Sequence, residues 1–277
     1  HCVQNGHPAY CSPVNFLGTP NILYRNNGDG TFTDVSVQSH IAQFVGKGMG
    51  ASFADYDGDG FTDIFVSNDT FPNYLLHNNR DGTFSEVGVT AGVAYNSFGN
   101  VVAGMGTDFL ERIAEGKPDI FDTAMFGEGL PLYRNQGGGQ FQDVTGSTRL
   151  GTLTSRLTAW GAGVYDFDND GHKDLFTADA DILDNAREVA HRPYPLPNGL
   201  FRNRGNFTFD DVAAQAGAGF AVPAAHRGAA FGDLNNDGKI DIVVAVLNGP
   251  PQSLINRTRN TNHWILLNLA GVKSNRD

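Results

Sequence analysis

The feature that most constrains this chain is a nine-residue acidic loop that occurs three times, each time between two apolar runs. The loops occupy residues 55–63, 166–174 and 233–241 and read DYDGDGFTD, DFDNDGHKD and DLNNDGKID. Side-chain oxygens at positions 1, 3, 5 and 9 converge on one point only if the chain turns tightly, and the glycine at position 6 permits that turn. With a backbone carbonyl from position 7, such a loop supplies the all-oxygen shell that Ca²⁺ prefers. The sequence therefore predicts about three calcium ions.

The expected ligands combine four side chains with one backbone carbonyl in each loop. They are Asp55, Asp57, Asp59, Phe61 and Asp63 in the first loop, Asp166, Asp168, Asp170, His172 and Asp174 in the second, and Asp233, Asn235, Asp237, Lys239 and Asp241 in the third, with Phe61, His172 and Lys239 contributing through their backbone carbonyls. The third loop has one carboxylate fewer, so we expect it to bind calcium most weakly. The alternative for each loop is a surface Asp/Gly turn that holds no ion.

The residues around the loops separate them from EF-hands. An EF-hand has a bidentate glutamate at position 12 and a helix on each side. Position 12 is Val66, Thr177 and Val244 in this chain. The runs before and after the loops are short and strand-like, and those that follow are rich in β-branched and aromatic residues. Each loop is therefore predicted to join two β-strands.

A second motif, a predicted β-hairpin with a Gly/Asn turn, follows the loops and sets the length of the repeat. It occupies residues 21–35, 73–87, 132–144 and 200–212. The asparagine that ends its first strand recurs at Asn26, Asn78, Asn135, Asn203 and Asn256, with spacings of 52, 57, 68 and 53 residues. A period of this size, built from four short strands, is typical of a β-propeller blade. The predicted fold class is all-β, a propeller of four-stranded blades with calcium-binding loops and little helix.

Together, the loops and hairpins resemble the FG-GAP (VCBS) repeats of integrin α-subunit propellers. The hairpin at 23–35 looks like those of bacterial proteins related to cartilage acidic protein, and residues 262–277 are similar to the opening of the ASPIC/UnbV segment that follows the propeller in those proteins. The resemblance covers nearly the whole chain. It implies a calcium-stabilised propeller of seven blades whose biochemical activity is largely unassigned.

The repeats amount to about four and a half blades. Residues 1–45 supply half a blade, fuller units follow at about 46–99, 100–157, 158–225 and 226–269, and 262–277 begin a truncated ASPIC/UnbV-like segment. Propellers normally close their rings and so leave no open sheet edge. We therefore expect the chain to come from a longer protein with a seven-bladed ring. The alternative is a five-sheet ring that closes with an incomplete blade.

The corresponding loop of the second full unit departs from the rule. It runs from Asp108 to Asp119, with three additional residues between its first acid and its glycine and without the alternating acids. Glu115 can stand at position 5, but the register of position 3 is lost. We expect this loop to be free of metal or to hold an ion differently, with Lys117 or Arg112 replacing the charge of the cation.

Cysteine content and charge bear on compartment and partners. Cys2 and Cys11 are the only two cysteines, and a disulfide between them, together with calcium loops, favours a secreted or cell-envelope protein whose signal peptide is not in this sequence. Unpaired or metal-binding thiols are the alternative. The net charge of −11 argues against a nucleic-acid partner, although three calcium ions would neutralise six of those charges. No apolar run is long enough to predict a membrane span.

No catalytic motif accompanies the loops, since nucleophile-elbow, P-loop and dinucleotide-binding patterns are absent from the sequence. The expected function is a calcium-binding extracytoplasmic propeller that acts as an interaction module for a protein or carbohydrate ligand, with calcium in a structural role. The alternatives are a polysaccharide- or lipid-processing enzyme on the same scaffold and a fragment without independent activity. An insertion at 179–198 either binds a ligand, through Arg187, His191, Arg192 and Tyr194, or packs as an arm on a neighbouring blade.

Overall fold

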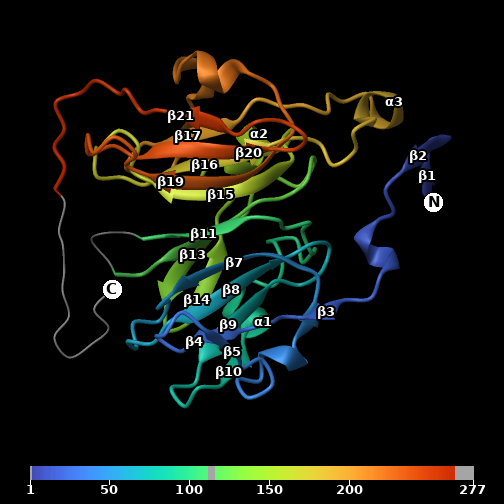
Figure 1. Cartoon of the computed structure of the whole chain (residues 1–277), viewed down its shortest axis with the longest axis vertical. Coiled ribbons are helices and arrows are strands. Elements are labelled where there is room, and N and C mark those ends of the chain that lie inside the picture. Colours follow the sequence, from blue (N-terminus) through green and yellow to red (C-terminus); the bar gives the residue numbers. More distant parts are fainter. Residues whose placement is uncertain (1, 112–115, 266–277) are drawn as a thin grey trace.

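The computed structural model describes residues 2–111 and 116–265, which form mainly small antiparallel sheets (Figure 1). Three of the sheets have four strands each. They consist of β7 (Gly48–Ala54), β8 (Asp63–Asn68), β9 (Tyr74–Asn78) and β10 (Phe84–Glu86), then β11 (Thr107–Leu110), β12 (Asp119–Asp122), β13 (Leu132–Gly137) and β14 (Gln140–Asp143), then β15 (Ala159–Tyr165), β16 (Asp174–Asp179), β17 (Gly199–Asn203) and β18 (Phe209–Asp211). The fourth sheet has three described strands, β19 (His226–Gly232), β20 (Asp241–Val246) and β21 (Gln252–Leu254).

The four sheets are arranged as blades of a β-propeller, which confirms the predicted fold class. Their first strands, β7, β11, β15 and β19, contact one another in sequence order. Glycine permits this close approach, because a Cβ atom on Gly106 would lie 2.0 Å from the carbonyl oxygen of Trp160, and one on Gly161 would lie 2.7 Å from that of Arg227. The inner strands therefore pack backbone against backbone, as is required where blades meet at the centre of a propeller.

Four short strands at residues 19–46 precede the first blade directly. They pair as β3 (Thr19–Pro20) with β6 (Val45–Gly46) and as β4 (Tyr24–Asn26) with β5 (Phe32–Asp34). The β4–β5 hairpin has the sequence of the outer hairpins of the blades, and the segment around it contributes Leu23 and Ile41 to a core shared with Ile64. The two pairs are separate two-stranded sheets, so the structure shows four blades, and the half blade expected at residues 1–45 stays a prediction. A seven-bladed ring stays a prediction.

Aromatic and aliphatic side chains fill the spaces between neighbouring blades. Phe65 packs with Ile120 and Tyr133 between the first and second blades. Phe121 packs with Leu175 between the second and third blades, and a corresponding cluster joins the third blade to the fourth. Burying a side chain of this size stabilises the fold by roughly 1.5–3 kcal/mol, so the apolar runs that flank each loop hold the blades together.

Helices are few and short, as expected. They are α1 (Gly88–Ala91), α2 (Leu150–Thr154) and α3 (Ala186–Ala190), with 3₁₀ turns η1 (Pro13–Asn15), η2 (Ile41–Gln43), η3 (Ala213–Gln215) and η4 (Ala218–Ala221). Within the described ranges, none of the helices has the length and apolar character needed to span a membrane. Residues 266–277, which include most of the expected ASPIC/UnbV-like segment, lie outside the described residues.

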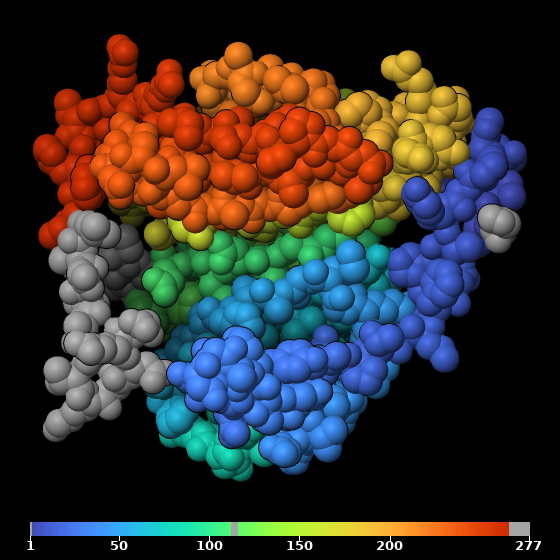
Figure 2. Space-filling model, viewed as in Figure 1, coloured from blue at the N-terminus to red at the C-terminus, as the bar shows by residue number. Residues whose placement is uncertain are grey.

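The predicted disulfide between Cys2 and Cys11 is confirmed. It closes a small hairpin of β1 (Cys2–Gln4) and β2 (His7–Ala9), whose strands the Gly- and Pro-containing sequence did not indicate. The hairpin packs on the insertion: Asn5 Nδ2 donates to the carbonyl of Val189 at 2.8 Å, and Asn185 Nδ2 donates to that of Pro8 at 2.8 Å. Figure 2 shows this N-terminal segment running along one side of the molecule to the insertion that contains α3. The insertion therefore packs as an arm. These contacts are with the N-terminal hairpin, whereas the sequence analysis expected contacts with a neighbouring blade.

Candidate metal centres

The three acidic loops lie at equivalent ends of their blades. They connect β7 to β8, β15 to β16 and β19 to β20, which confirms that each joins two strands. The glycine at position 6 has a positive φ in every case, 88° at Gly60, 89° at Gly171 and 79° at Gly238. Side chains other than glycine rarely adopt this conformation, so the glycine is what lets the acidic side chains turn toward a common point.

The first aspartate of each loop holds the turn closed. Asp55 accepts hydrogen bonds from the backbone amides of Gly58, Asp59 and Gly60, at 2.8, 3.0 and 2.7 Å. Asp166 and Asp233 accept from the amides at positions 5 and 6 of their own loops, at 2.7 to 3.0 Å. These carboxylates therefore shape the loop whether or not an ion is bound.

The last aspartate of each loop is buried and is the first residue of the strand that follows the loop. Asp63 and Asp241 are fully buried and Asp174 is 3% exposed. Asp63 accepts from the amide of Asn78 at 2.8 Å and from that of Tyr56 at 3.2 Å. The same two bonds recur in the other loops, where the donors are Asn203 and Phe167 for Asp174, and Asn256 and Leu234 for Asp241.

The asparagines that end the first strand of each hairpin also link neighbouring blades. The sequence showed that these asparagines recur, but it did not show this role. Asn135 Nδ2 in the second blade donates to the carbonyl of Tyr56 in the first loop at 2.8 Å. Asn256 Nδ2 in the fourth blade donates to the carbonyl of Phe167 in the second loop at 2.7 Å. Two of the acidic loops are thus part of the contact between blades.

Burial raises the pKa of the carboxyl groups of Asp63 and Asp174. The pKa of Asp63 rises to about 6, mainly because the side chain is buried and to a lesser degree because Asp57 is near. The pKa of Asp174 rises to about 7 through burial, with Asp168 and Asp170 adding repulsion. Buried carboxylates that repel one another are poorly stabilised as anions, and a bound cation would provide the missing opposite charge.

Two of the three loops bring carboxylates together as predicted. Oxygen atoms of Asp55, Asp57 and Asp59 lie within 4.8 Å of one another. Those of Asp166, Asp168 and Asp174 lie within the same distance. These sets fit a calcium ion, which takes six to eight oxygen ligands. The ligation expected from Asp170 and from the carbonyls of Phe61 and His172 stays a prediction.

The third loop is arranged less favourably. Of the described residues, no three carboxylates gather there within that distance. Lys239 Nζ lies 3.6 Å from Asp237 Oδ2, so an internal cation competes for one expected ligand. Asn235 Nδ2 also donates to Asp237 Oδ2, at 3.3 Å. Ion binding by this loop, and by the carbonyl of Lys239, stays a prediction.

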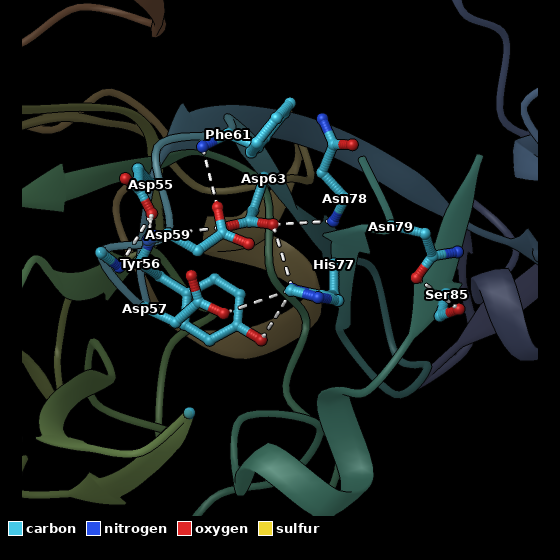
Figure 3. A network of polar contacts seen from close by, with 12 residues as sticks. Asp55, Tyr56, Asp57, Asp59, Phe61, Asp63, His77, Asn78, Asn79 and Ser85 are labelled. Carbon is cyan, nitrogen blue, oxygen red and sulfur yellow. Dashed lines mark hydrogen bonds and ion pairs between the residues drawn. The ribbon is translucent and has the colours of Figure 1, made fainter. Parts of the chain in front are cut away.

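The first loop has two neighbours that sequence reasoning did not assign to it. Arg80 pairs with Asp59, with Nη2 2.8 Å and Nε 2.9 Å from Oδ2. His77 on β9 places its Nδ1 atom 3.5 Å from Asp57 Oδ2 and 3.4 Å from Asp63 Oδ1 (Figure 3). The sequence did offer one signal for this contact, since His77 stands at a position where most other hairpins have arginine.

The irregular loop of the second blade uses its first acid differently. Asp108 accepts from the amides of Phe109 and Val164, each at 2.9 Å. The carboxylate therefore ties the second blade to the inner strand of the third. The expected roles of Arg112 and Glu115 fall outside the described residues, and that of Lys117 stays a prediction.

Comparison with known families identifies the repeats. The model of the FG-GAP-like repeat matches residues 14–66, 55–104, 115–177 and 185–244. The chain belongs to the FG-GAP-like repeat family. Cartilage acidic protein 1 of Homo sapiens is 31% identical to this FG-GAP-like chain over 221 residues, covering 74% of the chain and 31% of the relative. The Mus musculus protein is 28% identical over 261 residues, covering 85% and 37%. The chain spans about a third of the length of these relatives.

Solved structures align with the FG-GAP-like chain more loosely. A lectin of Agrocybe aegerita that recognises non-reducing terminal N-acetylglucosamine aligns with a TM-score of 0.36 and 16% identity, over 87% of this chain and 75% of the lectin. The V. cholerae biofilm matrix protein Bap1 aligns with a TM-score of 0.37 and 15% identity, over 83% of this chain and 35% of Bap1. The family assignment rests on the repeat model and the sequence relatives.

Proposed function

We propose that this FG-GAP-like propeller is an extracytoplasmic interaction module in which Ca²⁺ is a structural ion. The observation that carries the proposal is the convergence of three carboxylates within 4.8 Å in each of the loops at 55–63 and 166–174. Close carboxylates repel one another, and a hard divalent cation with oxygen ligands is the group that best relieves this repulsion.

The contacts of the loops explain why the ion would be structural. The carbonyls of Tyr56 and Phe167 accept hydrogen bonds from asparagines of the following blades. An ion that orders a loop therefore also orders the contact between two blades. An ion that binds only the folded chain stabilises it by about 2.7 kcal/mol per site when its concentration is a hundred times Kd.

Two observations support an extracytoplasmic location. The Cys2–Cys11 disulfide is a bond that persists outside the reducing cytoplasm, where calcium is also abundant. The relatives are named for cartilage, a tissue rich in extracellular matrix.

The ends of the blades opposite the acidic loops offer a surface for a ligand. The Arg227 guanidinium lies 4.0 Å from the centre of the Trp160 ring and 6.0 Å from that of Tyr194. Arg192 lies over Phe126 at 4.4 Å and pairs with Asp181 at 3.0 Å. Aromatic rings beside guanidinium groups are suited to sugar rings and to acidic groups on sugars or proteins. This surface supports the interaction role.

Binding to arrayed ligands tests the interaction role. Wild-type protein in calcium-containing buffer would be applied to neutral and acidic oligosaccharides and to purified extracellular-matrix proteins, beside Trp160→Ala and Phe53→Ala. Phe53 is a matched control because it is an aromatic residue, 60% exposed, on the inner strand of another blade. We expect Trp160→Ala to lose binding and Phe53→Ala to retain it, with both variants folded by circular dichroism. Failure of the wild-type protein to bind any arrayed ligand would contradict the proposal.

A further inference from the structure

The first acidic loop has a nitrogen ligand at its edge. The imidazole of His77 comes from β9, and its Nδ1 atom lies within 3.5 Å of carboxylate oxygens of both Asp57 and Asp63. One ligand atom from each of these three residues lies within 4.8 Å of the other two. Figure 3 shows the ring directed at the two carboxylates. Three ligands from two different segments therefore meet at one point.

The equivalent position in the other hairpins does not supply such a ligand. The residue before the hairpin asparagine is Arg134 in the second blade, Arg202 in the third and Ile255 in the fourth. A guanidinium stays protonated and has no lone pair to offer a metal, and isoleucine has no donor atom. Among these four blades, an imidazole at this hairpin position is thus particular to the first.

Other contacts in the first loop reduce its suitability for an oxygen-only shell. Asp59 forms an ion pair with Arg80 at 2.8 Å, whereas the second and third loops show no arginine in that role among the described residues. Asp57 and Asp63 are the two carboxylates that face His77.

We propose that Asp57, Asp63 and His77 form a binding site for a divalent transition metal, with Zn²⁺ as the preferred ion. The inference shares two ligands with the calcium site of the proposed function, so the two ions would compete in this loop alone. Calcium takes oxygen ligands, whereas zinc binds imidazole nitrogen and carboxylate oxygen together, usually with four ligands. The fourth position is open to water.

The distances suit a small ion. Zinc bonds of about 2.0–2.1 Å at tetrahedral angles place neighbouring ligand atoms roughly 3.3–3.4 Å apart. The observed separations from Nδ1 are 3.4 and 3.5 Å. The imidazole nitrogen therefore lies at a suitable separation from each carboxylate, and the two carboxylates lie within 4.8 Å of each other. His77 acts through Nδ1 in the neutral form that carries its proton on Nε2.

Metal titrations of the ion-free chain test the proposal. Zn²⁺ binding would be measured by isothermal titration calorimetry, and Co²⁺ would serve as a probe whose visible absorption increases in a four-coordinate site. The variants are His77→Gln and His77→Arg, the second of which introduces the residue that the second and third blades have at this position. His7→Gln is the control, because His7 is an exposed residue of β2 and belongs to no described cluster of metal-ligating groups.

We expect one zinc site per chain that weakens by at least about tenfold in both His77 variants and is unchanged in His7→Gln. Equal zinc affinity and equal cobalt spectra in wild type and His77→Gln would overturn the inference. Calcium titrations of the same proteins separate the two proposals. Calcium binding without any effect of His77 on zinc would leave the calcium proposal standing alone. Zinc binding that depends on His77, without calcium binding, would refute the calcium proposal and retain this one.

Discussion

Replacing Asp174 by asparagine should change the response of the protein to both pH and calcium. The pKa of this buried carboxyl is raised to about 7, chiefly by burial, from an ordinary value of 3.8. The folded chain then binds more protons than the unfolded chain between about pH 4 and pH 7, so the ion-free protein loses stability as the pH rises through this range. The slope is about 1.36 kcal/mol per pH unit well below the folded pKa and falls to half of that at the pKa, so this one group costs about 2.3 kcal/mol between pH 5 and pH 7.

Asparagine does not titrate, so the ion-free Asp174→Asn protein should lose about 2.3 kcal/mol less over the same interval. In saturating calcium at pH 7, by contrast, the wild-type protein should be stabilised more than the variant. The wild-type protein gains about 2.7 kcal/mol from the second site at a hundredfold excess of calcium over Kd, and the variant does not. Urea unfolding followed by circular dichroism, at pH 5 and pH 7 with and without calcium, measures both effects.

Asp122→Asn is the matched control. Asp122 is fully buried and its pKa is raised to about 7 by burial, but it bonds to Ser67 and Asn73 and belongs to no acidic loop. Its replacement should remove a similar pH dependence and leave the calcium response intact. Calcium stabilisation retained by Asp174→Asn, or lost by Asp122→Asn, would refute the reasoning.

Three further predictions concern the third loop, the contacts between blades and the disulfide. In a stepwise calcium titration followed by amide NMR, the Gly238 signal should shift at higher calcium than those of Gly60 and Gly171, because Lys239 pairs with Asp237; a Gly238 shift at lower calcium than the other two would show that this ranking is wrong. Asn256→Ala should lower the free energy of unfolding by about 1–3 kcal/mol, since it removes a donor to Phe167 at 2.7 Å; an unchanged urea midpoint would contradict this. Reduction of the Cys2–Cys11 disulfide should destabilise its hairpin by about 2–3 kcal/mol and expose it to proteolysis, and equal cleavage of the oxidised and reduced proteins would count against that role.

The strand–loop–strand units were predictable from sequence because they depend on neighbouring residues. The spacing of the acids, the glycine at position 6 and the short apolar runs define each loop without reference to the rest of the chain. The failure of this pattern after Asp108 also indicated a different role. That role depends on the amide of Val164, which lies in the next blade, so the sequence could not specify it.

The contacts that complete the loops could not be predicted because they depend on how the blades pack. Asn135 reaches the carbonyl of Tyr56 only when two blades are adjacent. His77 meets Asp57 and Asp63 only through the register of β8 with β9. The hairpin at Cys2–Ala9 escaped notice for a simpler reason, since its strands have three residues each and show no periodicity.

Calcium binding by the ion-free chain decides whether the acidic loops hold structural ions. Isothermal titration calorimetry and thermal unfolding would be carried out on the wild-type protein and on the Asp57→Asn/Asp168→Asn double variant. The account predicts two saturable calcium sites with a weaker third, together with a rise in melting temperature, and loss of the two stronger sites and of most of the rise in the double variant. A wild-type protein that binds no calcium and melts at the same temperature with and without it would contradict the account.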